Sequence, residues 1–247
     1  MGFELTVLGK YSPFPPASGA GSGYLIRGGG EYLLLDCGNG TLSRLQKFIG
    51  IDKVSALLLS HHHPDHKGDI SSLRHAWQAL IKQAKVEKPL RLYTTDEPRR
   101  EVSKLSRRSA FDLIKLRRGF DYPFRSFLIE WIKTHHPLKC AAFAINYDGK
   151  KMVYTGDTEL RAGSELYSFC RGADLLLCEA SLNEEEKGVI PGHMSAKEAA
   201  HLANEAGVKK LILTHFWPFY DEEGIKEKGR EIFKNTHVAK EEKTYVV

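Results

Sequence analysis

The chain has 247 residues, of which 42% are hydrophobic and 27% are charged, and its net charge at pH 7 is +5. This composition is typical of a folded protein and excludes a disordered or collagen-like chain. No hydrophobic run approaches the roughly 20 residues that a membrane-spanning helix needs, so we expect no membrane partner. The four cysteines show no Cys-x-x-Cys spacing, which favours a reducing, cytoplasmic location over a disulfide framework. The positive charge mildly favours an anionic partner.

Strands and helices are expected to alternate along the first half of the chain. Hydrophobic runs predict strands over 3–8, 24–27, 32–36, 56–59 and 90–94. The second and third of these strands are expected to form a hairpin around three consecutive glycines. Helical spacing of hydrophobic residues predicts helices over 41–49 and 71–84. Residues 97–118 contain eight Lys and Arg residues and are expected to form a basic, amphipathic helix.

The second half continues the same alternation. Strands are predicted over 140–147, 151–155, 175–178 and 211–214. The Asp148-Gly149 pair suits a type I′ turn and predicts a hairpin between the first two of these strands. Ser195 and Glu198 have the spacing of a capping box and predict a helix over 195–206. We therefore expect an α/β protein with one domain spanning residues 1–247.

A cluster of histidines follows the short hydrophobic strand at 56–59, in the sequence Ser-His-His-His-Pro-Asp-His from Ser60 to His66. Strand-like alternation places His61 and His63 on the same side, and His62 is expected to point away from them. Asp65 and His66 come from the turn into the next predicted helix. Imidazole nitrogens and a carboxylate oxygen suit Zn²⁺ and related divalent metals, so the segment predicts a metal site.

Further candidate ligands lie at the ends of later strands, where α/β proteins place ligands and chemistry. They are His135 or His136 before the strand at 140, Asp157 after the strand at 151, and His215 after the strand at 211. This set is sufficient for two metal ions. His61, His63 and one histidine of the 135–136 pair are expected to hold one ion, and Asp65, His66 and His215 the other, with Asp157 bridging. Two ions ~3.5–4 Å apart can activate a bridging hydroxide for in-line displacement.

These motifs resemble those of the metallo-β-lactamase superfamily over nearly the whole chain. The resemblance is carried by Leu34–Gly38, by the motif His61, His63, Asp65 and His66, and by the later ligands His136, Asp157 and His215. It implies a four-layer αβ/βα sandwich, and it selects His136 over His135 because the family's ligand directly precedes the proline. The aspartate at position 157 is typical of the hydrolase branches and is lacking there in true β-lactamases.

Within the superfamily, the chain is most similar to the ribonuclease Z-like and small phosphodiesterase branch. The stretches Leu177–Ala180, Gly192–Ser195 and Leu211–Phe216 carry this similarity. The resemblance implies that His193, held by Glu179, assists the departing oxygen of a phosphodiester. Asp65 is expected to orient the attacking hydroxide as well as to bind metal. Branch relatives are commonly dimers, which implies a homodimer.

The function predicted on these grounds is that of a dinuclear metal-dependent phosphodiesterase acting on a cyclic nucleotide or an RNA-derived diester. Zinc is the expected metal, and manganese and iron are alternatives because they accept the same ligands. One alternative function is a tRNA 3′-processing endonuclease, against which the lack of a long Gly/Pro-rich insertion argues. Others are a lactonase or thioesterase and, as a non-enzyme, a metal-binding RNA-interaction module. The basic segment 99–118 either steers an anionic substrate or packs on a partner subunit.

Overall fold

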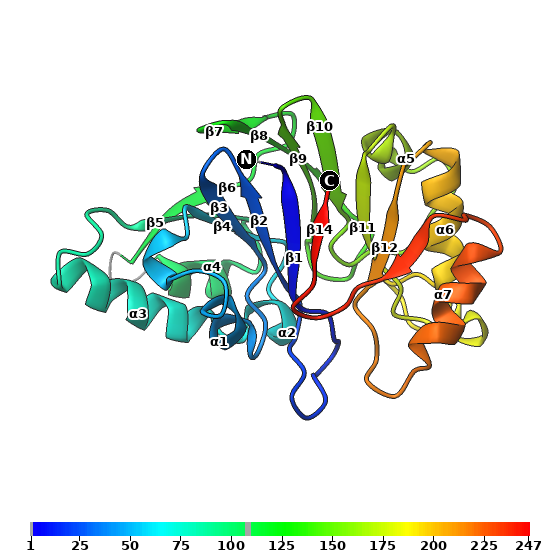
Figure 1. Cartoon of the computed structure of the whole chain (residues 1–247), viewed down its shortest axis with the longest axis horizontal. Coiled ribbons are helices and arrows are strands. Elements are labelled where there is room, and N and C mark those ends of the chain that lie inside the picture. The colour runs from blue at the N-terminus through cyan, green and yellow to red at the C-terminus, as the bar shows by residue number, and fades with distance from the viewer. Residues whose placement is uncertain (1, 107–109) are drawn as a thin grey trace. The chain divides into compact units, whose positions relative to one another are not determined.

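The computed structural model describes residues 2–106 and 110–247, and the chain divides into two compact units. Unit 1 comprises Met1–Arg117 and Glu241–Val246, and unit 2 comprises Arg118–Lys240 and Val247. Each unit contains one seven-stranded sheet (Figure 1). The expectation of a single domain over 1–247 stays a prediction.

The sheet of unit 1 is mixed. Its strands, in spatial order, are β14 (Thr244–Val246), β1 (Glu4–Gly9), β2 (Gly23–Gly28), β3 (Glu31–Leu35), β4 (Ala56–Leu59), β5 (Leu90–Thr94) and β6 (Phe111–Lys115). The pairs from β14 to β3 are antiparallel, and those from β3 to β6 are parallel. The predicted hairpin of β2 and β3 is present. The carboxyl ends of the parallel strands β3 to β6 therefore lie at one edge of the sheet.

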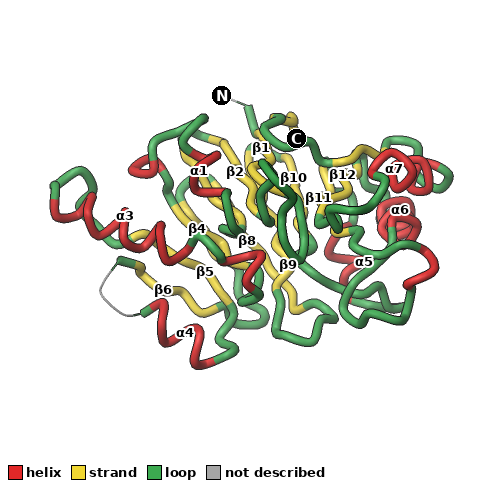
Figure 2. Tube along the Cα trace, turned by 90° about the horizontal axis from the view of Figure 1, so that it is seen from below, coloured by secondary structure: helices red, strands yellow, loops and turns green. Residues whose placement is uncertain are grey.

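Helices cover this sheet and bury its hydrophobic side chains. They are α1 (Thr41–Leu45), the 3₁₀ helix η1 (Ile51–Lys53), α2 (Pro64–Lys67), α3 (Ile70–Lys82) and α4 (Arg99–Leu105). The longest, α3, runs along the strands (Figure 2). Its Leu73 and Trp77 belong to one buried cluster with Leu57 of β4 and Leu92 of β5. This packing holds β4 in place, and the histidine segment begins where β4 ends.

The expected single helix over 97–118 is wrong. Of the described residues in this range, only Arg99–Leu105 is helical, and Phe111–Lys115 forms the edge strand β6, parallel to β5. Short hydrophobic runs are ambiguous between helix and strand, and tertiary pairing decides between them. Here β5 supplies the backbone hydrogen-bond partners, and the pairing buries Phe111. Residues 107–109 of the expected helix lie outside the described residues.

The sheet of unit 2 is also mixed. Its strands, in spatial order, are β13 (Thr236–Val238), β12 (Leu211–Thr214), β11 (Leu175–Glu179), β10 (Lys150–Tyr154), β9 (Ala141–Tyr147), β8 (Phe127–Lys133) and β7 (Tyr122–Phe124). Strands β10 to β13 are parallel, and β7 to β10 are antiparallel. Asp148 and Gly149 have φ values of 50° and 72°, as the predicted type I′ turn requires. The β7–β8 hairpin was not expected from the sequence.

The helices of unit 2 are α5 (Glu165–Cys170), the 3₁₀ helix η3 (Glu184–Glu186), α6 (Ala196–Glu205) and α7 (Glu222–Arg230). The predicted capping box begins α6: the Ser195 hydroxyl accepts from the Glu198 backbone N–H at 3.3 Å, and the Glu198 carboxylate accepts from the Ser195 backbone N–H at 3.0 Å. Helices α6 and α7 lie side by side (Figures 1 and 2). Among residues 2–106 and 110–247, no helix is long and apolar enough to cross a membrane.

Candidate metal centre

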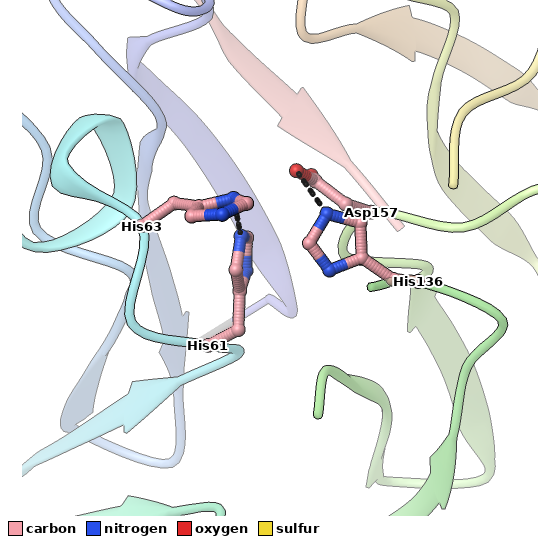
Figure 3. Close-up of side chains that lie close together, drawn as sticks. All are labelled: His61, His63, His136 and Asp157. Atoms are coloured by element: carbon pink, nitrogen blue, oxygen red, sulfur yellow. Dashed lines mark hydrogen bonds and ion pairs between the residues drawn. The ribbon is translucent and has the colours of Figure 1, made fainter. Parts of the chain in front are cut away.

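The first group of candidate ligands lies where β4 ends. All four residues of β4 are buried, and the chain then passes through Ser60 and the three histidines into α2, whose first residue is Pro64. The predicted pairing of His61 and His63 is present: the Nε2 atom of His61 lies 3.0 Å from the Nδ1 atom of His63 (Figure 3). Two imidazole nitrogens thus converge from one strand end. Asp65 and His66 follow on α2, and both are buried.

Asp36 organises this group from the neighbouring strand. Because β3 and β4 are parallel, the residues that follow them meet at the same edge of the sheet. Asp36 accepts hydrogen bonds from the Ser60 backbone N–H at 2.7 Å and from the Ser60 hydroxyl at 2.8 Å. Its Oδ2 atom also lies 2.8 Å from Nδ1 of His66. This contact leaves Nε2 of His66 facing Asp65, whose Oδ2 atom is 3.5 Å away.

The second group lies at one sheet edge of unit 2. Strands β10, β11 and β12 are parallel, so Asp157, Glu179 and His215 come from the same edge. His136 precedes β9, which is antiparallel to β10 and therefore begins at that edge. The Oδ2 atom of Asp157 is 3.9 Å from Nε2 of His136 (Figure 3), and its Oδ1 atom is 3.3 Å from Nε2 of His215. Asp157 thus lies between two imidazoles.

His66, His136 and His215 fit a metal centre because an outer partner holds Nδ1 of each ring and leaves Nε2 for a ligand cluster. Nδ1 of His136 lies 3.1 Å from the Leu138 carbonyl oxygen, and Nδ1 of His215 lies 2.6 Å from the Ser181 hydroxyl. Such partners orient a ligating histidine and set its tautomer. Burial also lowers the pKa of His136, which favours the neutral imidazole that binds metals. This donor set suits a divalent cation such as zinc.

A third cluster joins His193 to a buried carboxylate. Nδ1 of His193 lies 3.0 Å and 3.2 Å from the two carboxylate oxygens of Glu179. Glu179 also accepts from the Thr158 backbone N–H at 2.7 Å and from the Ser181 hydroxyl at 2.6 Å. These contacts fix the carboxylate. The Nδ1 contact directs Nε2 of His193 away from Glu179.

Within unit 2, ligand atoms of Asp157, His193 and His215 lie within 4.8 Å of one another. All three residues are candidates on the sequence alone. Ser181, which contacts both Glu179 and His215, was not expected from the sequence. A signal was available, because residues 179 and 181 are two apart at a strand end and alternation places them on the same side. The backbone N–H of Thr158, which is also part of the site, gives no signal in the sequence.

His62 points away from the candidate ligands, as expected. Its Nε2 atom lies 3.1 Å from the Thr94 hydroxyl at the end of β5. Burial lowers the pKa of His62 to about 4, so its ring is neutral at physiological pH. His135 contributes its backbone to the site, because its N–H donates to the Thr158 hydroxyl at 3.2 Å.

The chain is similar to known proteins over most of its length. A family model described as "Beta-lactamase superfamily domain" matches residues 31–216. The chain is 34% identical to the probable metallo-hydrolase YhfI of Bacillus subtilis, over 93% of each protein. It is 26% identical to a ribonuclease Z of Archaeoglobus fulgidus, over 97% of this chain and 96% of that protein.

Solved structures show the same fold. The crystal structure of the metallo-β-lactamase fold protein YhfI from B. subtilis matches with a TM-score of 0.94 at 32% identity, over 99% of each chain. Human tRNase Z, short form, matches with a TM-score of 0.77 at 21% identity, over 99% of each chain. The expected α/β fold of the metallo-β-lactamase type is therefore confirmed.

Proposed function

The chain belongs to the β-lactamase superfamily, and on that premise we propose that it is a metal-dependent phosphodiesterase. Metal-dependent hydrolysis is the activity that the family and the histidine and aspartate clusters support. One observation carries the narrower assignment to phosphodiesters. His193 is held by the Glu179 carboxylate within a few ångströms of Asp157, a candidate ligand. This arrangement suits a group that gives a proton to a departing alkoxide.

We assign the metal ligands on the superfamily's motif. His61, His63 and His136 would hold one divalent cation, and Asp65, His66 and His215 the other, with Asp157 bridging. The outer partners Asp36 and Ser181 support this assignment, because they hold His66 and His215 by the nitrogen away from the cluster. Zinc is the metal we propose. When bound, such cations polarise phosphoryl oxygens and make a water acidic enough to attack at neutral pH.

The chain's own residues supply the proton chemistry. Asp65 would orient the attacking water. His193, with Nδ1–H donating to Glu179, would act as an imidazolium that gives its Nε2 proton to the leaving oxygen and becomes neutral. Glu179 would stabilise the imidazolium before that transfer. An alkoxide is a poor leaving group, so such a proton donor accelerates cleavage by about 10²–10⁴-fold.

Turnover of bis(p-nitrophenyl) phosphate by zinc- or manganese-loaded protein tests the proposal. The comparison uses His193→Ala beside His201→Ala, which removes an exposed histidine of α6. We expect hydrolysis by the native protein that a chelator abolishes. We expect His193→Ala to lower kcat on this substrate, and His201→Ala to leave it unchanged.

A loss of similar size in both variants would show that His193 has no specific role. Because p-nitrophenolate leaves readily, the same pair should be repeated with a dinucleotide, whose leaving group is an alkoxide. The loss in His193→Ala should be larger for the dinucleotide, about 10²-fold or more, because its leaving group depends more on protonation. An equal loss on both substrates would contradict the leaving-group role.

A second candidate function is tRNA 3′ processing, which is favoured by the ribonuclease Z among the relatives. Incubation with a tRNA precursor that carries a 3′ trailer tests it. A single cut that releases the trailer would support this function, whereas release of mononucleotides or no cut would support a smaller or different diester.

A further inference from the structure

Within unit 2, the segment that carries His193 approaches His136 through a glycine. Gly192 has a φ of 87°, a backbone conformation that favours glycine. A Cβ atom at this position would lie 2.5 Å from Cδ of Pro137 and 2.8 Å from Cδ2 of His136. The next residue places its ring beside the same histidine, because the ring centroids of His136 and His193 are 5.6 Å apart. The backbone at Gly192 therefore helps to decide where the His193 ring lies.

The two flanks of His193 differ in how firmly they are held. On the C-terminal side, Met194 is fully buried, and its carbonyl oxygen accepts from the Leu182 backbone N–H at 3.2 Å. On the N-terminal side, Pro191 is exposed and Val189 is 72% exposed. An additional contact on the exposed flank is therefore required to fix the chain on both sides of His193.

Glu159 supplies such a contact. Its Oε2 atom accepts from the Gly192 backbone N–H at 3.3 Å. Its Oε1 atom pairs with the exposed guanidinium of Arg161. The Glu159 backbone N–H donates to the His135 carbonyl oxygen at 3.0 Å. One residue thus joins the loop after β10 to the segment before β9 and to the segment that carries His193.

The Glu159 side chain lines a cavity of about 490 Å³ and is 27% exposed. Glu165 lines the same cavity and is 55% exposed, and its carboxylate lies 3.5 Å from the guanidinium of Arg118. Removal of either carboxylate therefore leaves no closed void in the hydrophobic core. Glu165 thus offers a matched control for Glu159, with the same charge on the same cavity.

We propose that Glu159 is a positioning residue for His193. Its carboxylate holds the Gly192 N–H and so keeps the imidazole among the candidate ligands of unit 2. The inference rests on the proposed phosphodiesterase function and deepens it, because a displaced imidazole gives its proton to the leaving oxygen less efficiently. The effect should be specific to diesters whose leaving group is an alkoxide, since p-nitrophenolate leaves readily.

Hydrolysis of a dinucleotide and of bis(p-nitrophenyl) phosphate by the metal-loaded protein tests the proposal. Glu159→Ala removes the acceptor, whereas Glu159→Gln keeps a carbonyl oxygen for the Gly192 N–H. We expect Glu159→Ala to lower kcat on the dinucleotide by about tenfold, with changes below about twofold in KM and in the rate on bis(p-nitrophenyl) phosphate. Glu159→Gln and the control Glu165→Ala should hydrolyse both substrates at close to the native rate.

Three results would overturn the proposal. A native rate on the dinucleotide in Glu159→Ala would show that the contact is dispensable. Equal losses on the two substrates would show a general disturbance of the site. Equal losses in Glu159→Gln and Glu159→Ala would show that the charge matters and the hydrogen bond to Gly192 does not. Glu159→Asp, which withdraws the carboxylate from Gly192, covers the case in which the alanine variant fails to fold, and should show the same loss on the dinucleotide.

Amide hydrogen exchange at Gly192, followed by NMR, separates this inference from the proposed function because it needs no turnover. Glu159→Ala should raise the exchange rate there by about tenfold or more, since the amide loses its acceptor. The Glu198 amide, which donates to the Ser195 hydroxyl, should keep its rate, and Glu165→Ala should change neither amide. Unchanged exchange at Gly192 in Glu159→Ala would overturn the proposal. If the native protein hydrolyses neither diester, the phosphodiesterase proposal fails, whereas faster exchange at Gly192 would still show that Glu159 holds the segment.

Discussion

At the scale of single residues, the site depends on side chains that would touch neither metal nor substrate. Asp36 is fully buried, and its two oxygens satisfy Ser60 and hold His66 by Nδ1. We expect Asp36→Asn to lower metal affinity by about 10–100-fold, because an amide presents a donor where the carboxylate presents an acceptor. A chelator competition with zinc measures this. Asparagine tolerates the left-handed backbone at this position, where φ is 53°.

The control for this substitution is Asp112→Asn. Asp112 is about half exposed, and its ion pair with Arg91 is long, at 3.4 Å. We expect no change in zinc affinity there. Unchanged affinity in Asp36→Asn, with correct folding, would contradict the role of Asp36 in orienting His66.

At the scale of secondary-structure elements, the capping box of α6 makes a separable contribution to stability. Ser195→Ala removes the hydroxyl that accepts from the Glu198 N–H, and we expect it to lower the free energy of unfolding by about 1 kcal/mol. Ser168→Ala in α5 is the contrasting variant. The Ser168 hydroxyl donates to a carbonyl in its own helix, so alanine there should be neutral or slightly stabilising. Urea unfolding of both variants measures the difference, and equal effects would contradict the capping role.

Much of the fold could be predicted because its elements have local signals. The strand at 56–59, the turn at Asp148-Gly149 and the cap at Ser195 each depend on residues close in sequence. The strands that were not expected from the sequence depend on pairing with other strands. Strand β6 exists because β5 pairs with it, and the β7–β8 hairpin exists because β8 pairs with β9.

The candidate site follows the same division. The candidate histidine and aspartate ligands could be named from the sequence because metal-binding residue types cluster at strand ends. The outer partners were harder to identify from sequence, because a serine such as Ser181 is common and its role depends on which strands are neighbours. Only the fold shows that Ser181 contacts both Glu179 and His215.

At the scale of the whole molecule, all four cysteines are buried and free. Burial raises the pKa of Cys37 and of Cys170 to about 12 and also raises that of Cys178. Because the thiolate is the reactive form, these thiols stay protonated and inert at neutral pH. We expect the native protein to react negligibly with Ellman's reagent at pH 8 and the denatured chain to release four equivalents of thiol. Rapid reaction of one native thiol would contradict the burial.

The central claim is that the metal-loaded protein hydrolyses phosphodiesters rather than acyl substrates. The most direct measurement compares kcat/KM on one zinc-loaded preparation for three substrates: bis(p-nitrophenyl) phosphate, an aliphatic lactone and a thioester. We expect the diester to be hydrolysed and the two acyl substrates to be turned over at least ~100-fold less efficiently, a difference of about 2.7 kcal/mol in transition-state stabilisation. Turnover of the lactone or thioester without turnover of the diester would contradict the account.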